Sequence, residues 1–137
     1  MKMTNSQRTH IICQEFIEDI YDGDFRILII HGKPFQKTLA RIPQGNSFKG
    51  NLAAGGRGEA RDIWDYQKMI GEKVGEFLIE KHINFAGIDV IGKHLTEINI
   101  TSPTGAKEIK AGANIDVAKI FFDEVLKIIW VNDPIWL

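Results

Sequence analysis

The chain has 137 residues, with 17 Lys and Arg against 18 Asp and Glu. That length suits a single domain, and 44% hydrophobic with 26% charged residues is typical of a soluble globular protein rather than a disordered one. The balanced charge gives no electrostatic reason to expect nucleic acid or an anionic membrane as a partner. A single cysteine rules out an internal disulfide framework, and no apolar run reaches the roughly 20 residues of a transmembrane helix. We therefore expect a cytoplasmic protein.

The segment from residue 11 to residue 42 predicts three strands. Residues 11–20 mix apolar and acidic side chains and favour a strand that ends near Phe16, with Cys13 as a small core residue. The run FRILIIH at 25–31 is rich in β-branched residues and predicts a buried strand. Residues 36–42 predict the strand that returns from it, because Gly, Lys and Pro between the two runs favour a turn.

Residues 45–58 form an unusually glycine-rich segment, with five of the chain's 13 glycines. Loops of this length inside a compact domain are often lids or binding loops. Arg41, Lys49 and Arg57 lie in or beside it, and cations together with backbone amides suit a phosphate or a carboxylate. The alternative is a flexible solvated loop, because the spacing does not match a P-loop.

The second half of the chain predicts two helices and a hairpin, at residues 62–82, 85–91, 95–100 and 114–129. Asp62 is expected to cap the first helix. The tail from residue 130 to residue 137 is apolar and is expected to pack on something. Strands paired as hairpins with helices beside them predict an α+β fold, with an antiparallel β-sheet and flanking helices.

Asp89, Glu97 and Asn99 are the sharpest candidate cluster in the sequence. They are hard oxygen ligands of the kind that Mg²⁺ takes. Glu97 and Asn99 share a strand face, and Asp89 lies opposite Glu97 on that face if the loop has three residues, 92–94. A two-residue loop would place Asp89 on the other face. The alternative interpretation is the solvated face of an ordinary hairpin.

The turn at residues 101–105, which reads TSPTG, directly follows the strand that carries Asn99. Its hydroxyls and backbone amides are suited to a small carboxylate. An ordinary turn explains the same residues.

Taken together, these stretches resemble the C-terminal part of bacterial glutathione synthetase, an ATP-grasp ligase. The resemblance covers about residues 11–130. It is carried by DGDFR (22–26), ARIPQG (40–45), GNLAAGGRGE (50–59), GIDVIG (87–92) and LTEINITSPTG (95–105).

The resemblance implies the C-terminal subdomain of an ATP-grasp fold, with ATP as co-substrate and Mg²⁺ (or Mn²⁺) as cofactor. The family joins γ-glutamylcysteine to glycine, releasing ADP and phosphate, through an acyl phosphate. The expected Mg²⁺ ligands are Asp89, Glu97 and Asn99. The expected catalytic arginines, at the phosphate and acyl-phosphate site, are Arg26 and Arg41.

The remaining matches concern nucleotide and substrate binding. Cofactor-binding residues are expected at Gln14, Glu15, Phe16 and Asp24. Substrate and lid residues are expected at Lys49, Asn51, Gly55, Gly56, Ser102, Thr104 and Gly105. Lys49 stands where the family usually has Arg, which keeps the charge but loses bidentate geometry.

We expect residues 1–137 to form one domain, without the N-terminal substrate domain and central subdomain of the family. A complementing N-terminal chain and a homo-oligomer are the expected partners. The alternative to a ligase fragment is an inactive relic or a non-enzymatic interaction module, with weak or no nucleotide binding.

Overall fold

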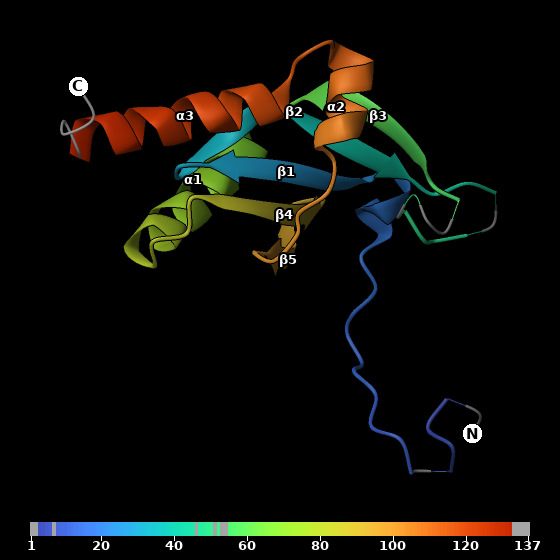
Figure 1. Ribbon diagram of the computed structural model, residues 1–137. Coiled ribbons are helices and arrows are strands. Elements are labelled where there is room, and N and C mark those ends of the chain that lie inside the picture. Colours follow the sequence, from blue (N-terminus) through green and yellow to red (C-terminus); the bar gives the residue numbers. More distant parts are fainter. Residues whose placement is uncertain (1–2, 7, 46, 51, 53–54, 133–137) are drawn as a thin grey trace.

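The computed structural model describes residues 3–6, 8–45, 47–50, 52 and 55–132. Within these residues the strands form one antiparallel sheet in the order β3-β2-β1-β4-β5 (Figure 1). The strands are β1 (Asp24–Ile30), β2 (Lys33–Ile42), β3 (Arg57–Asp62), β4 (Phe85–Ile91) and β5 (His94–Asn99).

Helices cover the two faces of this sheet. Helix α1 (Asp65–Glu80) lies on one face, and α2 (Ala106–Ala113) and α3 (Val117–Asn132) lie on the other (Figure 1). A short 3₁₀ helix, η1 (Glu18–Tyr21), leads into β1. None of the helices described is long and apolar enough to cross a membrane. The predicted α+β class with an antiparallel sheet is confirmed.

Strand β1 is buried almost throughout because helices lie on both sides of it. Ile27 and Ile29 point toward α1, and Leu28 and Ile30 point toward α2 and α3. Side chains alternate along a strand, so Arg26 shares the face of Leu28 and Ile30. This alternation places charged residues on the α2 side of the sheet, beyond the apolar core.

The N-terminal segment differs from the prediction. Residues 10–17 form no strand, and Cys13, expected in the core, is exposed. Figure 1 shows the segment leaving the sheet rather than joining it. Ile12 in this segment is 89% exposed, whereas Phe16 contacts the rings of Tyr21 and Phe48. Apolar composition alone does not make a strand without a neighbour for its backbone hydrogen bonds.

Strand β3 was not predicted, and the start of helix α1 differs from the prediction. β3 begins inside the glycine-rich segment, where its polar sequence RGEARD carries no apolar alternation. The expected helix start at Asp62 is wrong, because this residue ends β3 and pairs with Lys37 at 2.6 Å. Helix α1 begins later, where the Trp64 amide donates to Gln67 Oε1 at 3.1 Å.

Helix α2 was also not predicted, because charged residues dominate its sequence and are typical of a solvent-exposed surface. Lys107, Glu108 and Lys110 flank Ile109, and Ile109 is fully buried against the sheet. One anchoring residue in an eight-residue helix is too weak a periodic signal to detect. As for the C-terminal tail, Trp130 is 60% exposed, and residues 133–137 lie outside the described part of the chain.

Candidate functional site

The strand register brings three charged side chains into one row. Arg26 on β1 pairs with Asp89 on β4, and Asp89 pairs in turn with Glu97 on β5. On the other side of β1, Asp24 pairs with Arg41 on β2. Directly opposed residues of antiparallel strands share a face, so all five belong to the α2 side of the sheet.

Asp89 is the centre of this cluster. Arg26 donates to it through Nε at 2.5 Å and through Nη2 at 2.9 Å, which is a bidentate arrangement. Arg41 Nη2 lies 2.8 Å from Asp89 Oδ2 and 2.6 Å from Asp24 Oδ2. Two guanidinium groups are therefore fixed by two carboxylates, and Glu97 Oε1 lies 3.9 Å from Arg26 Nη2 at the open end of the row.

Burial makes these charges costly unless they stay paired. Arg26, Arg41 and Asp89 are 5%, 8% and 5% exposed. Burial would raise the pKa of the Asp89 carboxyl, but the Arg26 hydrogen bond and the Arg41 charge outweigh it and lower the pKa. For Asp24 burial prevails, helped by the charge of Asp89, and its pKa is raised despite Arg41. Asp24 Oδ1 is buried without a hydrogen-bond partner, so the cluster has an unused acceptor.

The expected metal ligands lie on neighbouring positions of β4 and β5. Asp89 opposes Glu97, and Asn99 opposes Gly87 two residues farther along. Two carboxylates and an amide oxygen suit Mg²⁺, which takes oxygen ligands and keeps several waters. In the described residues, however, no three His, Cys, Asp or Glu side chains converge as a metal-binding group.

The present partners of these ligands define what a cation has to displace. Both oxygens of Asp89 face guanidinium groups. Asn99 Oδ1 accepts from the backbone amides of Thr101 and Ser102 at 3.1 and 3.3 Å. Glu97 is the accessible ligand, with 55% of its side chain exposed.

The turn that follows β5 lies over Arg26. The Thr104 carbonyl accepts a long hydrogen bond of 3.4 Å from Arg26 Nη1. Gly105 has φ +118° and lies so close that an added Cβ would sit 3.3 Å from Arg26 Cγ. Ser102 and Thr104 are exposed beside it, so this expected substrate segment is adjacent to the charged cluster.

The glycine-rich segment approaches the cluster at Gly50 and at Gly58, which pairs with Arg41 across β2 and β3. Gly50 is buried, and a Cβ there would meet the Arg41 carbonyl oxygen at 2.6 Å. Neighbouring Lys49 is exposed, and its backbone amide donates to Ser47 Oγ at 3.1 Å. Gly55, with φ +92°, has open space around it, and Gly56 is half-buried. The expected lid residue Asn51 lies outside the described residues.

The expected nucleotide-binding segment borders a separate hollow of about 750 Å³. Gln14, Glu15 and Phe16 line it together with Leu95 of β5 and Phe48. The rings of Phe16 and Phe48 meet edge to face, with centroids 6.1 Å apart. Asp24, expected to bind cofactor, lies instead in the charged cluster as a partner of Arg41.

Thr38 is a supporting residue that the sequence reasoning missed. It is fully buried on β2, and its hydroxyl donates to the Arg26 carbonyl oxygen at 2.8 Å. The contact holds β1 in place where it carries the arginine. The sequence offers no clear signal for this role, because the polar residues Gln36 and Lys37 directly precede Thr38 in β2.

Comparison with solved structures identifies the class of fold. The chain aligns with the ATP-grasp ligase PsnB complexed with precursor peptide PsnA2 and AMPPNP, at a TM-score of 0.52 and 16% identity, covering 77% of this chain and 32% of that one. PsnB complexed with minimal precursor aligns at a TM-score of 0.54 and 16% identity, covering 83% and 36%. At such identity the match shows the fold alone, which is that of an ATP-grasp protein.

Sequence comparison then identifies the family. The sequence profile of the prokaryotic glutathione synthetase ATP-grasp domain matches residues 1–114, and the chain belongs to that family. The glutathione synthetase of Xylella fastidiosa (strain 9a5c) is 46% identical over 123 residues, and that of Pseudomonas putida is 49% identical over 115. These alignments cover 90% and 84% of this chain but 39% and 36% of the relatives. The chain thus spans about two-fifths of the length of the relatives it matches.

Proposed function

We propose that this chain forms the Mg²⁺- and triphosphate-binding wall of a glutathione synthetase-like ATP-dependent ligase. The observation that carries the proposal is the buried Arg26–Asp89–Arg41 network, which ends at the accessible carboxylate of Glu97. Fixed guanidinium groups beside free carboxylate oxygens suit a ligand that carries both phosphate and a divalent cation.

Arg26 and Arg41 are the proposed catalytic residues. Each is held by a buried carboxylate, so its charge is oriented before any substrate arrives. Preorganised charge stabilises negative charge that develops during phosphoryl or acyl transfer, and it costs no reorganisation at that moment. Releasing part of their present pairing to Asp89 would turn these arginines toward phosphate oxygens.

Asp89, Glu97 and Asn99 would hold the cation. A cation held by these residues would supply positive charge to offset the charge of a phosphate group. Glu97 is accessible as the structure stands, whereas Asp89 has to be shared with the arginines. We therefore propose that Glu97 makes the first contact with the cation.

The surroundings divide into a base side and a substrate side. Gln14, Glu15 and Phe16 border the hollow proposed for the adenine. On the other side of the cluster, Ser102, Thr104 and Gly105 are proposed to receive a substrate carboxylate. Lys49, Gly55, Gly56 and Asn51 are proposed to belong to a lid that excludes water from the acyl phosphate.

The proposed overall reaction joins γ-glutamylcysteine to glycine with ATP. Because the chain covers 39% of the Xylella fastidiosa relative, we propose that ligation requires the other parts of the ATP-grasp enzyme. A complementing chain is one way to supply them. We further propose that residues 1–137 act as one C-terminal subdomain in the cytoplasm.

Isothermal titration calorimetry of ATP with Mg²⁺ into the pure chain tests the binding proposal. We expect saturable binding that weakens at least tenfold, about 1.4 kcal/mol, in Glu97→Gln. The matched control is Glu72→Gln on α1, whose side chain is equally exposed (54% against 55%) and far from the cluster in the fold. Equal binding by both variants, or no binding by the wild type at millimolar ATP, would reject the proposed site.

A complementation assay tests the ligase activity separately. The chain is mixed with the part of the Xylella fastidiosa relative outside the matched 123 residues, and ADP release is measured with γ-glutamylcysteine and glycine. We expect ADP release to depend on γ-glutamylcysteine, on glycine and on Arg41. ATP binding without complementation would favour the alternative of a nucleotide-binding relic.

A further inference from the structure

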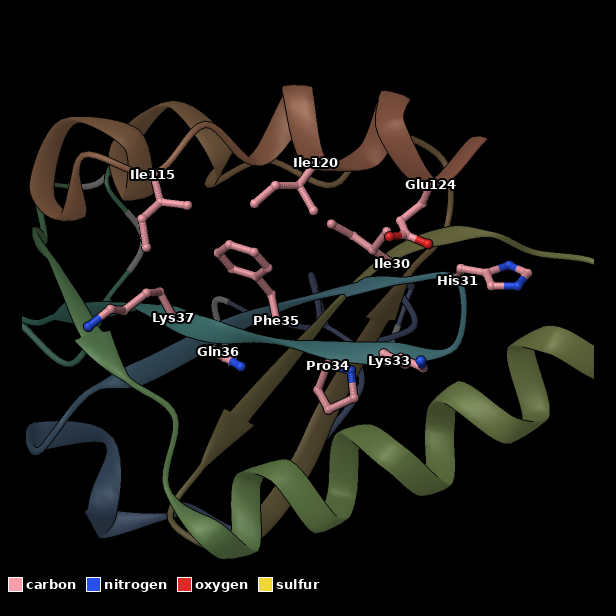
Figure 2. A pocket seen from close by; sticks show the side chains of 10 residues that line it. All are labelled: Ile30, His31, Lys33, Pro34, Phe35, Gln36, Lys37, Ile115, Ile120 and Glu124. Carbon is pink, nitrogen blue, oxygen red and sulfur yellow. The ribbon is translucent and has the colours of Figure 1, made fainter. Parts of the chain in front are cut away.

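The turn end of the β1–β2 hairpin encloses a hollow with α3, and we call it the hairpin hollow. Its volume is about 390 Å³, and its apolar walls are Ile30, Phe35, Ile115 and Ile120. Figure 2 shows Phe35 directed from β2 toward α3, with Ile115 and Ile120 directed back toward it. Small-molecule sites are typically hollows of about 300–1,000 Å³ with mostly apolar walls and a few polar groups. The hairpin hollow has the size and the walls of such a site.

An irregularity in β2 shapes the wall that Phe35 forms. Ile27 pairs with Thr38 across the two strands. Two residues farther along β1, Ile29 pairs with Pro34, which is four residues from Thr38. Strand β2 therefore carries two extra residues here, and such a bulge bends a strand and redirects its side chains. Because bulges are over-represented beside active sites, the irregularity agrees with a ligand site at this position.

Glu124 of α3 and Lys33 of β2 supply opposite charges at the rim of the hairpin hollow. Glu124 Oε1 accepts from Lys127 Nζ at 2.6 Å, which leaves Oε2 of the same carboxylate to a ligand. The hydrogen bond from Lys127 lowers the pKa of the Glu124 carboxyl. The charges of Lys127, Lys33 and His31 lower this pKa further, so the carboxyl is ionised at neutral pH. An apolar hollow thus presents a carboxylate and an ammonium group near each other.

We propose that the hairpin hollow binds a free α-amino acid with a large apolar side chain, for which phenylalanine is the model. The ligand's ammonium group meets Glu124, and its carboxylate meets Lys33. Its side chain lies against Phe35 and Ile120. Phenylalanine has about 12 non-hydrogen atoms, and 390 Å³ corresponds to the liquid volume of about 13 waters, so the ligand fits.

The paired charges disfavour simpler apolar ligands. A fatty acid would bring its carboxylate to Lys33 but would place it near the like charge of Glu124. An apolar amine would meet Glu124 but would bring its ammonium group near Lys33. Like charges brought together oppose binding, whereas a zwitterion matches both groups. Lys37, the other lysine of the hollow, does not alter this balance, because it pairs with Asp62 at 2.6 Å.

The hairpin hollow is separate from the charged cluster. Ile30 in the hollow and Arg26 in the cluster lie four residues apart on β1, which is roughly 13 Å along the strand. We therefore expect ATP with Mg²⁺ to leave the binding of the amino acid unchanged. Binding at the hollow is thus independent of the proposed ligase function.

Isothermal titration calorimetry of L-phenylalanine into the full chain tests the proposal. We expect saturable binding with a dissociation constant of about 1 mM or lower, as suits a ligand of this size. Phenylpropionate lacks the ammonium group, phenylethylamine lacks the carboxylate and alanine lacks the large side chain, so each should bind at least about tenfold more weakly. No saturation with phenylalanine, or equal binding by any of the three analogues, would overturn the proposal.

Glu124→Gln tests which side chain recognises the ammonium group. It should weaken phenylalanine binding at least about fivefold and remove the advantage of phenylalanine over phenylpropionate. The matched control is Asp123→Asn, since Asp123 is the neighbouring acid on α3, pairs with Lys119 at 2.7 Å and lies outside the hollow. Lys33→Gln should also weaken binding, with Lys119→Gln as its control. Equal losses in a variant and its control would show that these charges do not hold the ligand.

Derivatives of phenylalanine decide whether the ligand is a free amino acid or the end of a peptide. Phenylalaninamide keeps the ammonium group and acetylphenylalanine keeps the carboxylate, as the two ends of a peptide do. We expect both to bind at least about tenfold more weakly than the free amino acid. If either binds as tightly, the hollow receives a peptide terminus, and the assignment to a free amino acid is wrong.

Discussion

Asp89 and Glu97 lie directly opposite each other across β4 and β5, although only Gly92 and Lys93 separate the two strands. A two-residue loop in regular register would oppose Asp89 to Thr96 and turn Glu97 to the other face. The register instead shifts between Asp89 and Val90, so Thr96 is the extra residue of a β-bulge. The Thr96 hydroxyl donates to the Asp89 carbonyl oxygen at 3.1 Å. A local irregularity thus assembles the two carboxylates of the candidate metal site.

The buried charge of Asp89 should matter for stability as well as for binding. Asp89→Asn leaves two buried guanidinium groups without their shared anion, and such a loss costs about 3–5 kcal/mol. Urea unfolding at pH 7 measures the change. Glu97→Gln serves as the control, since its side chain is 55% exposed, and it should change the free energy of unfolding by less than about 1 kcal/mol. Equal effects would show that Asp89 is not held as described.

The pKa of Asp24 is raised, whereas that of Asp89 is lowered, so the two carboxyls should affect stability in opposite ways as the pH changes. The raised pKa of Asp24 means that the folded chain binds this proton more tightly than the unfolded chain does. The contribution of Asp24 is therefore fully favourable below its unfolded pKa, near 3.8, and is lost as the pH rises through its folded value. We expect Asp24→Asn to destabilise less than Asp89→Asn at pH 7, because the amide resembles the favoured neutral form. Urea unfolding from pH 4 to 7 tests this order.

The hairpin β1–β2 and helix α1 could be predicted because each has an unbroken local pattern. The run 25–31 is β-branched and apolar, and Val74 and Leu78 recur at a helical spacing. Strand β3 could not be predicted in this way, since RGEARD is an edge strand whose partner, β2, supplies its order. Conversely, residues 11–16 have strand-like composition but no partner in the sheet. Pairing is a tertiary property that composition does not contain.

The candidate site, too, could be predicted only in part. The resemblance singled out Arg26, Arg41 and Asp89 individually, and the structure places them in one buried network. Their mutual neutralisation depends on the lateral register of three strands, which no single stretch of sequence encodes. The pairing of Asp89 with Glu97 depends on the extra residue Thr96. Alternation of apolar and polar residues along the sequence does not reveal such a β-bulge. Sequence patterns therefore indicated the participants, and strand pairing determines their contacts.

Tyr66 should titrate at a higher pH than an ordinary tyrosine does. Burial raises the pKa of Tyr66, helped by the nearby charges of Asp19 and Asp22. A phenol with a raised folded pKa stabilises the protein below its unfolded pKa, about 10, and that contribution is lost as the pH rises through the folded value. Ultraviolet absorbance titration of Tyr21→Phe, in which Tyr66 is the remaining tyrosine, should give a midpoint above the ordinary tyrosine value of about 10. Asp19→Asn should lower the Tyr66 midpoint, and a midpoint that Asp19→Asn leaves unchanged would contradict the assigned environment.

Gly75 sets two general effects against each other. Replacing an interior helical glycine with alanine ordinarily stabilises a helix by about 1 kcal/mol. Here an added Cβ would lie 1.9 Å from the Gly32 carbonyl oxygen, at the turn between β1 and β2. Backbone cannot move aside as a flexible side chain can, and overpacking of this kind costs about 1–3 kcal/mol or more. We therefore expect Gly75→Ala to destabilise, by at least about 1 kcal/mol, in urea unfolding.

The control for that comparison is Gly45→Ala, where no atom lies within 4 Å of the added Cβ and only the positive φ of +60° opposes the change. A left-handed conformation costs alanine about 1–2 kcal/mol, without any collision. No compensating substitution at the turn can relieve Gly75→Ala, because residue 32 has φ +75° and must itself remain glycine. Gly75→Ala can then be relieved by a shift of α1 away from the turn. Such a shift should expose Leu78, which is now 1% exposed, and should speed the exchange of backbone amides in the segment around it. A stabilised Gly75→Ala variant would mean that α1 sits farther from the β1–β2 turn than the structure has it.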